Sequence, residues 1–136
     1  MPRSLRSILA ALLALGLSAC VPYPAYRTTQ PEAELQVLDE QDQPLAGASV
    51  TLIARAHPTP FEQSRETRGT DAEGIARFAS QHEWQAEVMF LHGRLVYYWE
   101  WCVTAAGYQT ALIPFSTPLQ VRLQPGESEP CPAPRD

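Results

Sequence analysis

The segment Leu95–Tyr108, LVYYWEWCVTAAGY, is the one long run of the chain in which strand-forming residues dominate without interruption. Side chains alternate between the two faces of a strand, so Cys102 lies on the opposite face from an almost wholly apolar set: Leu95, Tyr97, Trp99, Trp101, Val103 and Ala105. Such an apolar face must pack on another layer, and in a short chain a second sheet is the simplest one. The segment therefore predicts an all-β sandwich with Trp99 and Trp101 in its core.

Composition sets the size and excludes one class of partner. The chain has 136 residues, enough for one domain, and its 13 prolines and 7 glycines suit a turn-rich β protein. It has no lysine, and without the two arginines of the first twenty residues it carries eight arginines against fifteen acidic residues, a formal charge of minus seven. Binding to nucleic acid needs clustered positive charge, so we expect no nucleic-acid partner.

The first twenty residues have the pattern of an export signal. A short basic region precedes the apolar run Ile8–Leu17, which is too short to cross a bilayer of about 30 Å as a helix. The run ends in Leu17-Ser18-Ala19-Cys20, which resembles the lipobox of bacterial lipoproteins. This resemblance implies that residues 1–19 are removed and that Cys20 is lipidated, which anchors the chain to a membrane. The alternative is an ordinary secretory signal with a chance cysteine.

The residues after Cys20 bear on the cellular address. Residue 21 is valine, not the aspartate that resembles an inner-membrane retention signal, which favours the outer membrane with the domain on its periplasmic face. The alternative is that the domain lies on the outer surface of the cell. Residues 20–31 contain three prolines and no apolar periodicity, so we expect a semi-extended tether. The alternative is a first strand that packs on the sandwich.

The rest of the chain alternates short apolar runs with turn signals. We expect a hairpin of strands 34–38 and 45–52, an exposed loop or irregular edge over 55–68, and a turn at 70–74 before strand 75–78. A final pair of strands, 108–115 and 119–123, completes the sheet. Residues 125–136 form a Pro-rich tail with too few apolar residues to pack by itself.

Three ordered landmarks carry a family resemblance. The segments 43–52 (QPLAGASVTL), 70–78 (TDAEGIARF) and 103–108 (VTAAGY) resemble those of the carboxypeptidase regulatory-like domain, a prealbumin-like (transthyretin-like) fold. The resemblance implies a seven-stranded antiparallel or mixed β-sandwich over residues 32–124. The segment 80–98 is longer than in that family, so we expect an extended hairpin inserted before the Gly-Tyr strand, turning at residues 92–94.

Few residues suggest chemistry. With Cys20 lipidated, Cys102 and Cys131 remain, and an oxidising compartment favours a disulfide between them; two free thiols are the alternative. His57, His82 and His92 lack a metal-binding spacing, and Asp71 and Glu73 fit a turn better than a calcium site. No nucleophile elbow or phosphate-binding glycine loop occurs. We therefore expect no metal, no cofactor and no enzymatic activity.

Two surfaces are candidates for binding. Arg55, Arg65 and Arg68 make the 55–68 segment a candidate protein contact, although a solvated loop is the simpler interpretation. Tyr98 and an outward Trp84 have rings that can stack on a sugar or a partner. We expect a non-enzymatic, membrane-anchored interaction or structural module of the cell envelope, or, as the alternative, a module that binds cell-wall glycan.

Overall fold

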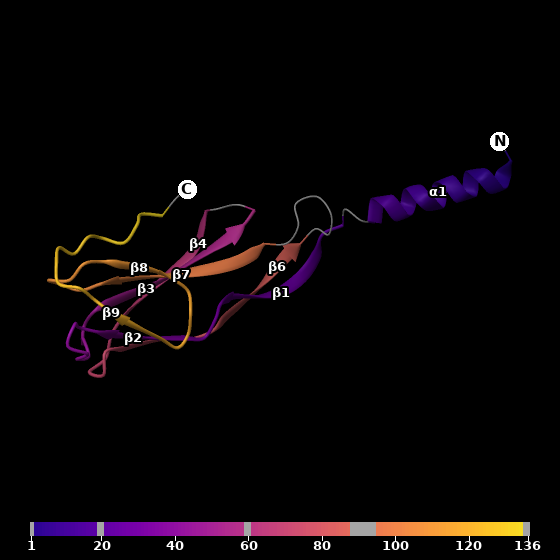
Figure 1. Cartoon of the computed structure of the whole chain (residues 1–136). Helices are drawn as coiled ribbons and strands as arrows, with labels where there is room; N and C mark the ends of the chain where they lie inside the picture. The colour runs from indigo at the N-terminus through magenta and orange to yellow at the C-terminus, as the bar shows by residue number, and fades with distance from the viewer. Residues whose placement is uncertain (1, 19–20, 59–60, 88–94, 135–136) are drawn as a thin grey trace.

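The computed structural model describes residues 2–18, 21–58, 61–87 and 95–134, and within them the chain is one helix followed by strands (Figure 1). The elements in chain order are α1 (Arg3–Ser18), β1 (Tyr23–Gln30), β2 (Ala33–Leu38), β3 (Ser49–His57), β4 (Glu62–Gly69), β5 (Ile75–Phe78), β6 (Gln81–Glu87), β7 (Val96–Thr104), β8 (Ala111–Pro114) and β9 (Leu119–Arg122). In the described part of the chain, no helix combines the length and the apolar character needed to span a membrane.

Two sheets form the body of the molecule, one with the strand order β5-β2-β9 and the other with β4-β3-β7-β8. Both contribute to one buried cluster, which includes Leu35 and Val37 of β2, Val50 and Leu52 of β3, and Trp101 of β7. Because the apolar faces of both sheets meet in this cluster, the two sheets are the layers of a sandwich. The all-β sandwich expected from the sequence is thus confirmed.

The largest buried side chain of the core is Trp101, which is 0% exposed. Its ring lies 5.3 Å from that of Phe78 on the opposite sheet and 5.5 Å from that of Phe115, and its indole N–H donates to the carbonyl of Ser116 at 3.0 Å. Trp99 is half-buried and packs at the edge of the core. Both tryptophans therefore lie on the core side of β7, as predicted, with Trp101 at the centre.

The expected hairpin of strands 34–38 and 45–52 was wrong. β2 pairs with β5 and β9, whereas β3 pairs with β4 and β7, so the chain crosses from one sheet to the other between them. The Asp39 carboxylate accepts hydrogen bonds from the backbone N–H groups of Gln41 and Gln43, both at 2.8 Å, and closes a turn. Gly47, with φ of 75°, then follows in the connection to the second sheet.

The last two strands also separate. β8 pairs with β7, while β9 crosses to the other sheet and runs parallel to β2. A tight turn cannot join two parallel neighbours, and β2 and β9 are accordingly far apart in the sequence. With β5 on one side and β9 on the other, β2 is the central strand of its sheet.

β1 and β6 pair with each other and form a separate two-stranded sheet, which we call the arm. The structure differs here from the expected tether over residues 20–31, because Tyr23–Gln30 is a strand. It also differs from the expected hairpin insertion, because β6 pairs with β1 and not with β7; the expected turn at 92–94 lies outside the described residues. Both strands of the arm have an open edge, where a proline such as Pro24 can lie without removing a ladder hydrogen bond.

The turn before β5 is tightly closed. The Asp71 carboxylate accepts the amides of Glu73 and Ile75, as the turn signal predicted, and Gly74 has φ of 72°. A methyl group added at Gly74 would lie 2.5 Å from the Val37 carbonyl oxygen, a backbone atom that cannot move aside. Both the backbone conformation and the available space therefore require glycine at this position.

Gly74→Ala should therefore lower the free energy of unfolding by at least about 2 kcal/mol, the left-handed backbone alone accounting for about 1. Urea unfolding would measure it. Gly69→Ala is the matched control, because nothing lies within 4 Å of the added methyl; its effect should stay within about 0.5 kcal/mol. At Gly47 the backbone is left-handed but nothing lies near an added methyl, so the loss of stability in Gly47→Ala should be intermediate between those of the other two variants. Equal effects at positions 47 and 74 would contradict the role given to the close approach.

Candidate functional site

The outward face of the sheet β4-β3-β7-β8, which we call the outer face, brings together three of the four residues expected to contact a partner. Ladder pairing places Tyr98 beside Arg55, and Arg65 beside Ile53, the residue two positions before Arg55 on the same strand face. Arg68 pairs with Val50, whose side chain faces the core, so it belongs to the other side of the edge strand β4. The 55–68 segment is thus mainly strand, with β4 as an edge.

The arginines of the outer face are held by carboxylates. Arg55 donates to Glu100 through Nε at 2.9 Å and is only 13% exposed, and Tyr98 stacks on the ring of His57 at 4.9 Å. Arg65 donates through Nη2 to Glu62 at 2.6 Å, and this hydrogen bond raises the pKa of Arg65. These groups form a fixed, charge-balanced surface, which would bind a partner without rearranging its side chains.

The C-terminal tail crosses the outer face, where a disulfide and hydrogen bonds hold it. Cys102 and Cys131 form a disulfide with a Cα–Cα distance of 5.9 Å, which confirms the pairing expected from the sequence. The backbone N–H of Glu129 donates to the hydroxyl of Thr110 at 3.0 Å, and Arg65 donates to the carbonyl of Pro132 at 2.9 Å. Because Cys102 lies on the non-core face of β7, only a segment crossing the outer face could reach it.

The arm docks on the sandwich through polar contacts. The Trp99 indole N–H donates to the Thr29 carbonyl at 3.1 Å, and Gln85 donates to the Tyr97 hydroxyl at 2.5 Å. At the base of the arm, Glu66 of β4 accepts hydrogen bonds from Gln30 at 2.6 Å and from Gln81 at 3.1 Å. The bond from Gln30, followed by Arg68 and Gln81, lowers the pKa of Glu66. The arm is therefore fixed relative to the core.

A polar cleft of about 140 Å³ lies between the arm and β4. Hydroxyl and amide side chains dominate its lining: Thr29, Gln63, Ser64, Gln81, Glu83, Gln85 and Tyr97. The Thr29 hydroxyl is buried and, alone among the buried side-chain polar atoms of the described residues, has no hydrogen-bond partner. The amide and hydroxyl side chains that line the cleft suit a small ligand or segment rich in hydroxyl or amide groups.

The opposite face of the arm is exposed and aromatic. Tyr26 and Trp84 are opposite each other in the register and are 57% and 71% exposed, with ring centroids 5.1 Å apart. His82 stacks on Tyr26 at 5.4 Å. Sequence reasoning named Trp84 as a ring that could point outward but missed the surface, because Tyr26 was assigned to a tether. The signal that could have found it is the uncharged residue at every second position, at 24, 26 and 28 in one segment and at 82, 84 and 86 in the other.

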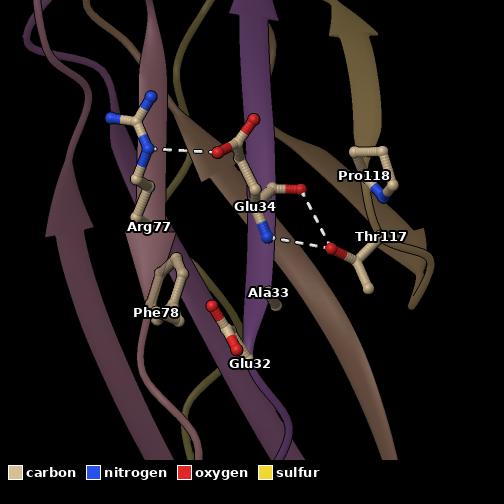
Figure 2. A pocket seen from close by; sticks show the side chains of 7 residues that line it. All are labelled: Glu32, Ala33, Glu34, Arg77, Phe78, Thr117 and Pro118. Atoms are coloured by element: carbon tan, nitrogen blue, oxygen red, sulfur yellow. Dashed lines mark hydrogen bonds and ion pairs between the residues drawn. The ribbon is translucent and has the colours of Figure 1, made fainter.

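A second hollow, with a volume of about 310 Å³, lies between β2, β5 and the start of β9 (Figure 2). Arg77 donates to Glu34 at 3.0 Å, and the backbone N–H of Glu34 donates to the Thr117 hydroxyl at 2.9 Å. Figure 2 marks both interactions as dashed lines. Arg77 also binds Asp71, which raises the pKa of Arg77. The polar groups at this site hold the strands to one another, and we assign it no ligand.

Among the described residues, no group of three His, Cys, Asp or Glu side chains could hold a metal ion. His57 and His82 are instead engaged with the rings of Tyr98 and Tyr26, and His92 lies outside the described residues. Asp71 and Glu73 belong to the turn before β5, where Asp71 accepts backbone amides.

Comparison with known protein families, with curated proteins and with solved structures gave no match to this chain.

Removing the disulfide should loosen the tail and destabilise the sandwich. The bond joins residues separated by 29 positions, and closing a loop of this size contributes about 3 to 4 kcal/mol in the chain-entropy description. Cys131→Ser should lower the free energy of unfolding by an amount approaching this, and protease should cleave the tail faster. Ala133→Ser, an exposed substitution in the same segment, is the control. Unchanged stability in Cys131→Ser would show that the tail adds nothing to the fold.

The contacts of Glu66 predict how the docking of the arm depends on pH. Its pKa is lower in the folded protein than its ordinary value of 4.5, so its stabilising effect is complete above that value and is lost as pH falls through the folded pKa. Glu66→Gln should be less stable than the wild type at pH 7, and the difference should shrink as pH falls below about 4.5. Urea unfolding across pH would measure it, with Glu40→Gln in an exposed turn as the control for charge. A difference that stays constant with pH would contradict this role.

Proposed function

We propose that the protein is an exported bacterial lipoprotein that is anchored through Cys20 to the outer membrane and faces the periplasm. The observation that carries the proposal is the segment Leu17-Ser18-Ala19-Cys20 directly after a basic and apolar leader. In the proposed mature protein the lipidated cysteine is the first residue, and β1 begins at Tyr23. Several acyl chains on one cysteine, at about 0.8 kcal/mol per buried methylene, would hold the domain on the membrane.

We further propose that the domain is a non-enzymatic interaction module, built as a prealbumin-like sandwich of the carboxypeptidase regulatory-like type. Gly47, Gly74 and Gly107, one in each landmark segment, all have positive φ, which supports a structural role for the landmarks. On the outer face Arg55 and Arg65 are paired with carboxylates, and Arg65 also binds the disulfide-bound tail. A rigid, charge-balanced surface of this kind suits recognition of a protein of the envelope.

The second candidate function is binding of cell-wall or extracellular glycan. The polar cleft between the arm and β4 favours it, because the amide and hydroxyl side chains that line the cleft match a ligand rich in hydroxyl groups. Tyr97, which also lines the cleft, offers a ring beside these polar groups.

Crosslinking in cells tests the proposal. The full-length protein should appear in the outer-membrane fraction with the mass of a lipidated Cys20, and crosslinking should capture one defined envelope protein. Cys20→Ser should lose the lipid mass and the membrane association, and the captured amount should drop at least about tenfold because the anchor no longer concentrates the two proteins.

The control for the surface is a pair of charge reversals, Arg65→Glu on the outer face and Arg122→Glu on β9. Only the first should reduce capture, because Arg122 lies on β9 of the other sheet, where it binds Asp42 of the turn after β2. Capture of polysaccharide alone, lost in Thr29→Val, would support the glycan candidate. A Cys20 without lipid in the native host would refute the proposed anchoring.

A further inference from the structure

We propose that the exposed face of the arm lies on the interface of the phospholipid bilayer and so orients the sandwich on the membrane. This inference rests on the proposed anchoring at Cys20 and adds a second, non-covalent contact with lipid. The residues that carry it are on the face of β1 and β6 that points away from the sandwich, which we call the aromatic face.

The aromatic face carries no formally charged residue at neutral pH. The register aligns its residues in three cross-strand pairs: Pro24 with Ala86, Tyr26 with Trp84, and Thr28 with His82. All six are exposed. The charged residues of the two strands, Arg27, Glu83 and Glu87, all lie on the opposite face. A charged face would resist transfer to the bilayer interface, and this one has no such charge to desolvate.

The rings of this face are of the kind found at membrane interfaces. Tryptophan and tyrosine have an apolar body and one polar group, and they concentrate at the level of the lipid headgroups. Trp84 is 71% exposed, the most exposed large apolar side chain among the described residues, and Tyr26 packs beside it. Contact with lipid headgroups would cover both rings and leave their N–H and O–H groups in the hydrated layer.

The position of the arm brings this face near the anchor. Tyr23 follows Cys20 by three positions and Tyr26 by six, and an extended chain covers at most about 3.6 Å per residue. The start of β1 therefore lies within about 11 Å of the lipidated cysteine and Tyr26 within about 22 Å. In Figure 1 β1 starts at the end of the arm that points away from the sandwich, and this is the end of the strand nearest to Cys20 in the sequence. The anchor thus holds the arm, rather than the sandwich, beside the bilayer.

The other face of the arm is not available for this contact. Arg27 and Glu87 form an ion pair there at 2.6 Å, and Gln85 binds Tyr97 of the sandwich. Since that face is charged and docked, only the aromatic face can turn toward lipid. Because the arm is fixed to the core, a bilayer contact on this face would also fix the orientation of the sandwich.

Quenching of tryptophan fluorescence by brominated lipid tests the inference. Full-length protein with its lipid, verified by mass, would be reconstituted into phosphatidylcholine vesicles with plain or brominated acyl chains. The emission of Trp84 is obtained by subtracting the emission of the Trp84→Phe variant from that of the wild type. We expect brominated vesicles to reduce it at least about twofold, because an interfacial indole reaches the acyl boundary. The emission left in Trp84→Phe, from Trp99 and the buried Trp101, should change little.

Two substitutions that each introduce one charge test the contact while Trp84, the fluorescent probe, stays in place. Thr28→Glu adds a charge to the aromatic face, and Leu112→Glu adds the same charge at an exposed apolar position on the outer face. Quenching should fall in Thr28→Glu and stay at the wild-type level in Leu112→Glu. Equal quenching in both variants would contradict a contact through this face.

The outcomes separate the inference from the proposed function. If the protein carries its acyl chains but Trp84 is not quenched, anchoring stands and the bilayer contact is refuted. If the emission of Trp84 responds to soluble cell-wall glycan and not to brominated lipid, the aromatic face binds glycan and the inference is also refuted. If Cys20 carries no lipid in the native host, the proposed anchoring fails and the inference fails with it.

Discussion

Burial of Trp101 between the two sheets is the interaction on which the rest of the structure depends. Its ring contacts Phe78 from the opposite sheet and Phe115 from the connection that leads to β9, so one side chain joins both layers. The carbonyl of Ser116 satisfies the indole N–H, which would otherwise be a buried donor without a partner. Once Trp101 is fixed, the phase of β7 is fixed as well, and every other side chain of that strand has an assigned face.

The fixed phase of β7 explains how the same strand organises both candidate surfaces. Cys102 must face outward because Trp101 faces inward, so the tail can be bonded only across the outer face. Glu100, on that same face, reaches Arg55. Trp99, on the core side two positions before Trp101, lies near the edge of the core and donates to Thr29 of the arm. The core, the tail and the arm are thus held by neighbouring residues of one strand.

The sequence was sufficient for features that depend on one strand or one turn. The alternation of β7 predicted the core tryptophans and the outward Cys102, and the residue types at 70–74 predicted the turn that Asp71 closes. Pairing was not accessible in the same way, because periodicity gives the face of a residue but not the neighbour of its strand. The prediction that β2 pairs with β3 failed for this reason. The arm was missed because the prolines of residues 20–31 favoured a tether over a strand, although a strand with an open edge tolerates proline. Likewise, the register of β3, β4 and β7 decides which arginines share a surface: Arg65 and Arg68 are three positions apart, so they face opposite sides of β4.

The distribution of charge gives the two ends of the molecule opposite tendencies at a membrane. Each arginine of the described domain after residue 20 is paired with a carboxylate, so the charge left over on the sandwich is negative. A surface of anionic lipid would repel such a body, within a Debye length of about 8 Å at physiological salt. The aromatic face of the arm has no charge to be repelled and has rings that favour the interface. In the proposed arrangement, therefore, repulsion keeps the sandwich off the lipid while the arm stays on it, and the outer face is left accessible to a partner in the periplasm.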